Sequence, residues 1–310
     1  MTKPTACAAV LYAQIGKRDK QAHTKLTMCM NTSFLIRSCL LFLTLLIPSW
    51  AGAEKPSFAP PFYPFQNGVK FETPEEGARV LKQLGYDGIG SVYGKDLANY
   101  LKAYEKVGLR VFSIYVGGKL ETDGHSYDPV VSEAIASLKG SKTIVELYVQ
   151  KGKESTDEQA LAFVREIADQ AKASGLRVVL YPHTGFYVAT AGDALRIAKA
   201  SGRDNVGVAF NLCHFLKVEP QSDVRKTLEE IRPYLWSVST CGADSDGTDW
   251  QQLIRPLDEG SFDQSSLLRQ LREAGYQGPV GLQCYAIKID PQENLQRSIS
   301  AWRKILAASQ

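Results

Sequence analysis

Two histidines follow neighbouring apolar runs in the C-terminal half of the chain. The first run, residues 178–183, reads VVLYPH and ends at His183; the second, residues 206–214, reads VGVAFNLCH and ends at His214. Imidazole titrates near neutral pH, so either side chain could act as a general acid or base. A structural role, with the ring held by hydrogen bonds inside the protein, is the alternative, and the residues alone leave both open.

Amide, hydroxyl, carboxylate and aromatic side chains also stand where apolar runs end. Such groups suit the hydrogen bonding and stacking of a sugar, and we predict that they bind a small-molecule carbohydrate. The alternative is that they only solvate the rim of the fold. The predicted substrate-binding residues are Asn67, Tyr181, Asn211, Asp244 and Gln283, and Gln66, Tyr93 and Tyr285 occupy comparable positions.

Three other polar features are better explained by structural roles. Glu146 lies in the middle of an apolar run, where a carboxylate must be paired, and Arg177 near the start of the next run is its predicted partner. His125 lies in a polar stretch and is predicted to be on the surface. The sequence DSDG from Asp244 resembles the start of a calcium loop, but Arg255 stands at the twelfth position, where an EF-hand needs Glu.

The elements that must position these residues alternate between short apolar runs and helical patterns. Strands are predicted over residues 62–69, 86–92, 109–116, 143–149, 176–181, 206–211, 235–240 and 279–285. Helices are predicted over residues 74–84, 96–107, 128–138, 156–173, 190–200, 224–231, 264–274 and 291–306. Thr73 is the predicted N-cap of the first helix and Gly85 its stop.

This alternation predicts an α/β fold, a single closed (β/α)8 TIM barrel. The strand runs are continuously apolar, which indicates a parallel sheet buried on both faces by helices. Residues 54–310 are close in number to the roughly 250 typical of such a barrel. Neither a GxGxxG motif after the first strand nor a P-loop occurs, which argues against a dinucleotide-binding sheet. Barrel active sites lie at the C-terminal ends of the strands, where the residues above are expected.

The N-terminal segment has the layout of a cleaved secretory signal peptide. Arg37 precedes the apolar run 39–48, and the small residues AGA follow at positions 51–53. The run is shorter than the roughly 20 residues that span a bilayer, although an uncleaved anchor is the alternative. We predict cleavage before Glu54, an extension and signal at 1–53, a barrel domain at 54–310, and an exported protein, periplasmic or secreted, without stable membrane insertion. Met1, Met28 and Met30 are all possible translation starts.

Charge and cysteine content exclude further classes. Residues 1–53 hold six of the 36 Lys and Arg and one of the 33 Asp and Glu, so residues 54–310 carry 30 basic and 32 acidic side chains, a net charge of −2. Such a chain has no electrostatic attraction for nucleic acid. The three cysteines after the signal, Cys213, Cys241 and Cys284, form neither a disulfide framework nor a zinc motif, and we predict that they pack in the core.

Three stretches near the predicted strand ends match a set of motifs. Residues 271–283 (LREAGYQGPVGLQ) resemble L-x-x-x-G-Y-x-G-x-x-x-x-E before a last strand, residues 206–214 resemble V-G-x-x-x-D-x-x-H, and residues 178–183 resemble v-x-l-E-x-H. Together they resemble the xylose isomerase-like TIM barrel superfamily, which includes sugar phosphate isomerases and epimerases and type IV AP endonucleases.

The departures from that family concern its divalent metal. Family enzymes hold it with Glu, Asp, His and Glu on strands five to eight, and the matching positions here are Tyr181, Asn211, Ser239 and Gln283. Neutral amides and hydroxyls are poor ligands for a hard cation, so we predict no metal and no other cofactor.

The resemblance implies a sugar isomerase or epimerase with a rewired site, and the N-terminal segment predicts that it is exported. His183 or His214 would be the base, with Asn211 and Gln283 as neutral donors to the enolate oxygen. The alternative is a non-catalytic sugar-binding barrel that lost its chemistry with the metal. An AP endonuclease is disfavoured, because it needs several metal-binding His, Asp and Glu residues and a basic face.

Overall fold

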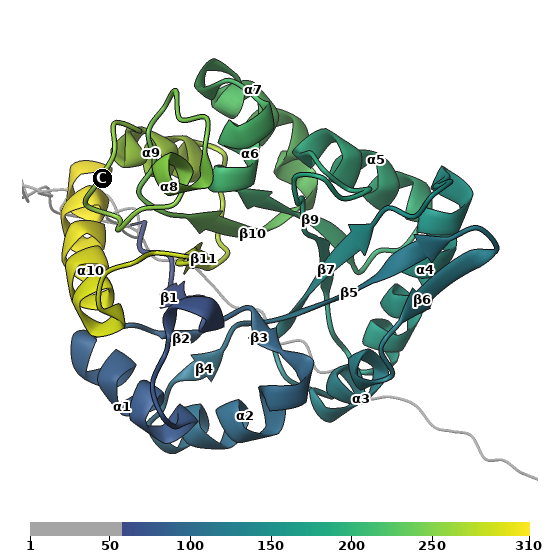
Figure 1. Ribbon diagram of the computed structural model, residues 1–310, viewed down its shortest axis with the longest axis horizontal. Coiled ribbons are helices and arrows are strands. Elements are labelled where there is room, and N and C mark those ends of the chain that lie inside the picture. The colour runs from purple at the N-terminus through teal and green to yellow at the C-terminus, as the bar shows by residue number, and fades with distance from the viewer. Residues whose placement is uncertain (1–57) are drawn as a thin grey trace, which may run out of the picture. The chain divides into compact units, whose positions relative to one another are not determined.

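The computed structural model describes residues 58–310, so the predicted signal peptide and its cleavage site lie outside the described residues. The strands are β1 (Phe62–Pro64), β2 (Gly88–Ile89), β3 (Val92–Tyr93), β4 (Arg110–Val111), β5 (Ser113–Glu121), β6 (Gly124–Tyr127), β7 (Ile144–Gln150), β8 (Val178–Leu180), β9 (Val206–Asn211), β10 (Leu235–Thr240) and β11 (Val280–Leu282). The main sheet has the order β1-β11-β10-β9-β8-β7-β5-β3 with parallel neighbours throughout, and helices surround it (Figure 1). This is the TIM-barrel-like α/β fold that the alternating pattern predicts.

Helices follow nearly all of the strand positions. The α-helices are α1 (Pro74–Leu84), α2 (Leu97–Lys106), α3 (Val130–Ser137), α4 (Asp157–Ala173), α5 (Ala191–Ser201), α6 (Leu212–Val218), α7 (Val224–Ile231), α8 (Trp250–Leu253), α9 (Gln264–Glu273) and α10 (Pro291–Ala308). Short 3-10 helices are η1 (Gln66–Gly68), η2 (Gly94–Asp96), η3 (Gln221–Asp223) and η4 (Arg232–Tyr234). Among residues 58–310, no helix combines the length and apolar character needed to cross a bilayer.

Local capping explains where the predicted helices begin and end. The Thr73 hydroxyl accepts a hydrogen bond from the backbone N–H of Glu76 at 3.2 Å, and Gly85 ends α1 with a positive φ of 89°. Thr156 and Thr190 each form a capping box at the start of α4 and α5. Each cap contributes about 1 kcal/mol, and the box at Thr190 fixes the end of the loop that follows β8.

The prediction of a closed barrel is wrong at one seam. The ladder stops at β1 and β3, whose edges are joined by a single bridge between Phe65 and Gly90, while β2 pairs only with β4. The second strand is interrupted because Ser91 takes a left-handed φ of 48°, which extended backbone does not allow. Glycine is required beside it, since a Cβ at Gly90 would lie 2.0 Å from the Tyr63 ring.

Three elements were not anticipated from the sequence. β5 runs past the barrel and turns into β6, which pairs with it in antiparallel fashion through residues such as Leu120 and His125. α6 follows β9 without an intervening turn, and α8 lies in the loop after β10. The first of these helices carries His214.

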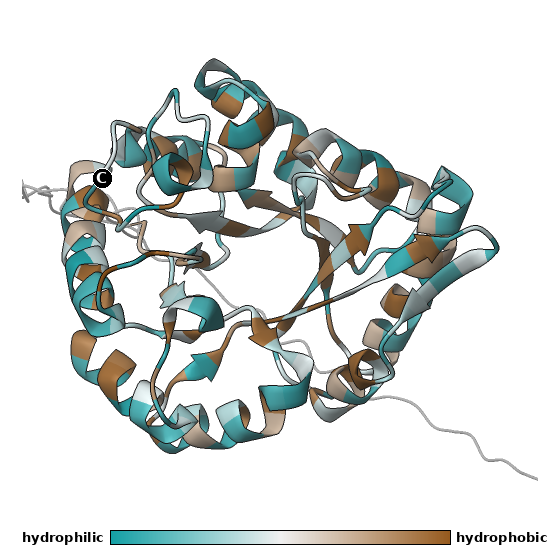
Figure 2. Cartoon of the chain, viewed as in Figure 1, coloured by the Kyte–Doolittle hydropathy of each residue, from teal (hydrophilic) through white to brown (hydrophobic). Residues whose placement is uncertain are grey.

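The core has two layers, as expected for this fold. The larger cluster lies between strands and helices, and Figure 2 shows hydrophobic residues concentrated there, with hydrophilic residues on the outer helix faces. The smaller cluster fills the inside of the strand ring, where Tyr63 stacks on Phe112 with ring centroids 4.6 Å apart. The three predicted core cysteines are confirmed as buried and free.

One predicted structural role is wrong, and another is met only in part. Arg177 does not pair with Glu146; its guanidinium lies 4.9 Å from the ring of Trp236, because Arg177 precedes β8 and lies beyond the ring interior. His125 is not a free surface side chain: its Nε2 lies 2.8 Å from Glu166, its ring packs against Phe163 at 5.0 Å, and only 16% of the side chain is exposed.

Candidate functional site

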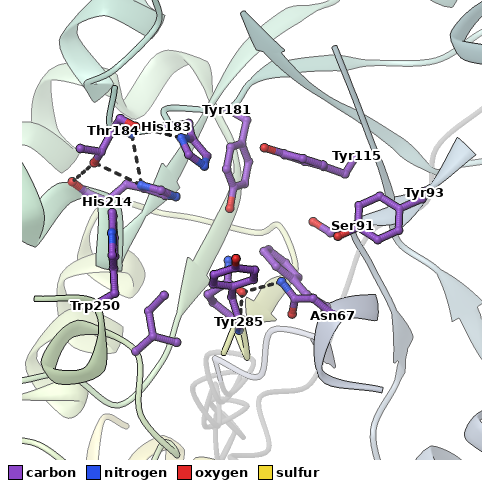
Figure 3. Close-up of a pocket in the computed structure, with 13 residues that line it drawn as sticks. Asn67, Ser91, Tyr93, Tyr115, Tyr181, His183, Thr184, His214, Trp250 and Tyr285 are labelled. Carbon is purple, nitrogen blue, oxygen red and sulfur yellow. Dashed lines mark hydrogen bonds between the residues drawn. The ribbon is translucent and has the colours of Figure 1, made fainter. Parts of the chain in front are cut away.

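A cavity of about 490 Å³ opens among the C-terminal ends of the strands, the position expected for a barrel active site. Figure 3 shows the two histidines and Thr184 on one side and Ser91, Tyr93 and Asn67 on the opposite side. The lining residues are Phe65, Asn67, Ser91, Tyr93, Tyr115, Tyr181, His183, Thr184, His214, Trp250, Ile254, Gln283 and Tyr285.

His183 lies in the loop between β8 and α5 and presents one free ring nitrogen. Its Nδ1 lies 3.0 Å from the carbonyl oxygen of Thr184, and a carbonyl can only accept, so Nδ1 carries the proton. The ring stacks on Phe186 with centroids 3.9 Å apart. Burial lowers the pKa of His183 below its usual 6.5, so the ring is neutral at pH 7 and Nε2 has a free lone pair.

His214, in the first turn of α6, has the opposite tautomer. The backbone N–H of Thr184 donates to its Nδ1 at 3.2 Å, so the proton of the neutral ring lies on Nε2. Burial, and secondarily the neighbouring His183, lowers the pKa of His214 to about 3. The ring also packs edge-on against Trp250 at 5.2 Å. His214 is therefore a neutral hydrogen-bond donor across the physiological pH range, and a poor base.

One residue thus sets the two rings in complementary states. Thr184 accepts from His183 with its carbonyl and donates to His214 with its N–H, and the ring centroids lie 4.2 Å apart. In Figure 3 the ring edges away from Thr184 point into the cavity. The cavity wall therefore presents one imidazole acceptor beside one imidazole donor.

The opposite side of the cavity holds an amide pair. Asn67 on η1 donates through Nδ2 to Oε1 of Gln283 at 2.8 Å, and the same oxygen accepts from the backbone N–H groups of Cys284 and Tyr285, both at 2.9 Å. These bonds hold both amides in place. Oδ1 of Asn67 is buried and has no hydrogen-bond partner among the described residues.

Two of the predicted substrate-binding residues act behind the cavity wall. Asn211 does not line the cavity; its Nδ2 donates to the hydroxyl of Tyr181, and its Oδ1 accepts from the thiol of Cys213 at 3.2 Å. Asn211 therefore orients Tyr181, which does line the cavity. Asp244 also lies outside the lining and forms an ion pair with Arg255 at 2.6 Å. Arg255 is the residue that stands where an EF-hand loop would need Glu.

Sequence reasoning missed part of the lining. Thr184, Ser91, Tyr115 and Trp250 were not singled out, although Thr184 directly follows His183. Trp250 lies in the long loop after β10, where α8 brings it to His214, and no local pattern indicates that contact. With Tyr93 and Tyr285 it leaves an exposed aromatic rim that suits stacking on a sugar ring.

The positions that match the family's metal ligands contain no charged group. Tyr181, Asn211, Ser239 and Gln283 are all buried, and the hydroxyl of Ser239 has no partner within the described chain. Across residues 58–310, no three His, Cys, Asp or Glu side chains are grouped as metal ligands would be.

The chain matches a known family over most of the described region. The model of the Xylose isomerase-like TIM barrel family matches residues 78–305. A search of curated proteins found no match.

Solved structures share the fold at low sequence identity. The apo crystal structure of the 3-keto-D-glucoside 4-epimerase YcjR from E. coli has a TM-score of 0.64 and 19% identity, covering 79% of this chain and 100% of that one. An L-ribulose 3-epimerase has a TM-score of 0.62 and 16% identity, covering 81% and 95%. The IOLI protein with a bound zinc atom has a TM-score of 0.64 and 16% identity, covering 79% and 98%.

Proposed function

Because the chain belongs to the xylose isomerase-like TIM barrel family, we propose that it is a sugar isomerase or epimerase. The observation that carries this proposal is the histidine pair, in which Thr184 holds an acceptor nitrogen of His183 beside a donor nitrogen of His214. Enolisation of a keto-sugar needs both: a base that removes the proton next to the carbonyl, and a donor that holds the enolate oxygen.

The two histidines divide the chemistry as follows. Nε2 of His183 takes the proton from the carbon next to the carbonyl, and Nε2–H of His214 donates to the carbonyl oxygen as negative charge develops there. A positioned base contributes roughly 10²–10⁴-fold to a rate, and a preorganised donor roughly 10²–10³-fold. His214 is suited to this second role, because its ring stays neutral down to a pKa of about 3 and the hydrogen bond from Thr184 to Nδ1 keeps its proton on Nε2.

The proposal includes independence from the family's divalent metal. Tyr181, Asn211, Ser239 and Gln283 offer neutral oxygens and amides, which do not fit a divalent cation that prefers anionic oxygen. His214 then supplies the electrostatic stabilisation that a metal would otherwise provide.

A keto-sugar is the proposed substrate class. The amides of Asn67 and Gln283 can bind sugar hydroxyls, and the aromatic rim of Tyr93, Trp250 and Tyr285 can stack on the ring. The names of the neighbours, a 3-keto-D-glucoside 4-epimerase and an L-ribulose 3-epimerase, agree with this class. Export after cleavage before Glu54 is part of the same proposal and would place the substrate outside the cytoplasm.

The test is deuterium exchange followed by NMR. Chelator-treated protein is incubated in D₂O with D-psicose, D-tagatose, L-ribulose or a methyl 3-keto-D-glucoside. We expect at least one sugar to exchange the hydrogen next to its carbonyl and to form an isomer or epimer. His183→Asn should lower the rate about 100-fold or more, whereas His125→Asn, at a histidine outside the cavity, should not. Binding of these sugars without exchange would support the binding-only alternative and refute the enzyme.

A further inference from the structure

A buried carboxyl group lies inside the strand ring, apart from the histidine pair. Glu146 on β7 is 1% exposed, and its register partners are Tyr115 on β5 and Val179 on β8. Within residues 58–310 it forms no ion pair with a cation; its partners are hydroxyl groups. Ser91 donates to Oε2, Ser237 donates to Oε1 at 3.5 Å, and Ser113 also hydrogen-bonds the carboxyl.

Ser91 connects this carboxyl to the cavity. It lines the cavity while its Oγ donates to Glu146. Its backbone has a φ of 48°, in the left-handed region that a non-glycine residue rarely adopts, and its N–H donates to the Ser113 hydroxyl at 2.8 Å. Such strain persists only where surrounding structure enforces it, and it is concentrated at functional sites. The same distortion interrupts the strand between β2 and β3.

The surroundings allow the carboxyl to hold or release a proton near neutral pH. Burial raises the pKa of Glu146 to about 7, against the opposing effect of the three serine hydroxyls. The other titratable groups facing it are tyrosines whose pKa values are all raised by burial, so they are neutral: Tyr63 on β1, Tyr115 on β5, Tyr181 after β8 and Tyr276 before β11.

We propose that Ser91 is a second proton-transfer residue, acting on the face of the sugar opposite His183, and that Glu146 is the positioning residue that supplies its proton. This inference rests on the proposed function and extends it to epimerisation. It is carried by the placement of Ser91 and His183 on opposite sides of the cavity (Figure 3) and by the hydrogen bond from Ser91 to Glu146. Inversion at a carbon requires proton removal from one face and proton return on the other.

The protons balance over one turnover. The C–H bond breaks as Nε2 of His183 takes the proton, which leaves an enolate whose oxygen accepts from His214. When the carboxyl of Glu146 is protonated, the hydrogen bond that Ser91 makes to it reverses: Glu146 donates to Ser91 Oγ, and the Ser91 hydroxyl proton is freed for the cavity. Ser91 then gives this proton to the opposite face of the carbon as Glu146 gives its own proton to Ser91 Oγ. The products are the epimer, a protonated His183 and an ionised Glu146; proton exchange with water through the cavity restores both side chains.

The test separates exchange from inversion with the NMR assay and the sugars named above. Ser91→Ala and Glu146→Gln should still exchange the hydrogen next to the carbonyl, because His183 is intact, but should form epimer at least about 100-fold more slowly. Glutamine keeps a side-chain partner for Ser91, so Glu146→Gln should fold even if Ser91→Ala does not. Ser237→Ala removes a hydroxyl from the same carboxyl but no cavity-lining group, and should still form epimer.

The pH profile gives a readout that a merely structural role would not change. In the direction in which His183 removes the proton and Ser91 returns it, the wild-type rate of epimer formation should fall as pH rises through about 7, because the carboxyl of Glu146 must be protonated. Glu146→Gln should not show this fall in rate. Epimer formation at the wild-type rate in Ser91→Ala and Glu146→Gln would overturn this inference and leave the isomerase proposal intact. Loss of exchange together with inversion in folded variants would overturn the assignment to the opposite face. A wild-type protein that neither exchanges nor epimerises any of the sugars would refute the proposed function, and this inference with it.

Discussion

Replacing His214 by Asn should remove a specific part of the protein's acid sensitivity. The pKa of His214 is about 3 in the folded protein and 6.5 in an unfolded chain. The unfolded state therefore binds a proton at higher pH than the folded state. The stability that His214 contributes is present above pH 6.5 and is lost as pH falls from 6.5 towards 3. At pH 4.5, two pH units below the unfolded value, this loss is about 3 kcal/mol.

The assay is urea unfolding of wild type and His214→Asn at pH 7.5 and pH 4.5. The fall in unfolding free energy between the two pH values should be about 3 kcal/mol smaller in the variant. Carboxylates with lowered pKa values, such as Asp157 and Glu166, add to the fall in both proteins and cancel in the comparison. His125→Asn is the same change outside the cavity. In this variant the part of the fall in unfolding free energy that His214 causes should remain. An equal fall in wild type and His214→Asn would refute the neutral, buried state of this ring, and with it the assigned donor role.

Three further predictions concern the ligand, the metal and export. Gln283→Ala removes the acceptor of Asn67 and should weaken binding of the sugar that is turned over by about 1–3 kcal/mol in calorimetry; unchanged affinity would show that the amide pair only solvates the rim. Manganese, magnesium or zinc at micromolar levels should leave the melting temperature unchanged, whereas a rise that disappears in a double His183→Ala and His214→Ala variant would show a metal site built from the histidines. The exported protein should begin at Glu54 on N-terminal sequencing, and an intact N-terminus in the cytoplasm would rule out the signal peptide.

The sequence predicted the units of the fold well where local signals are strong. α1 and β9 match their predicted bounds, since Thr73 and Gly85 mark the helix ends and residues 206–211 form a continuous apolar run. The seam between β1 and β3 could not be predicted, because it depends on the left-handed backbone of Ser91 and on the packing of Tyr63 against Gly90. Serine carries no sequence signal for that conformation.

The candidate site was only partly predictable, for a related reason. His183 and His214 could be placed at adjacent strand ends, but their tautomers depend on Thr184, which reaches across to α6. Glu146 was expected to pair with Arg177 because a buried carboxylate needs a partner, and the sequence could not show that serines from three separate strand positions take that role. Contacts between side chains that are far apart in the sequence cannot be predicted from local sequence patterns.

Catalysis by the histidine pair without a divalent metal can be tested by a single rate. It is the rate at which the keto-sugar incorporates deuterium before and after the protein is stripped of metal by a chelator. We expect the same rate in both samples, and loss of that rate in His183→Asn. Loss of exchange on chelation, with recovery on adding manganese or magnesium, would contradict it.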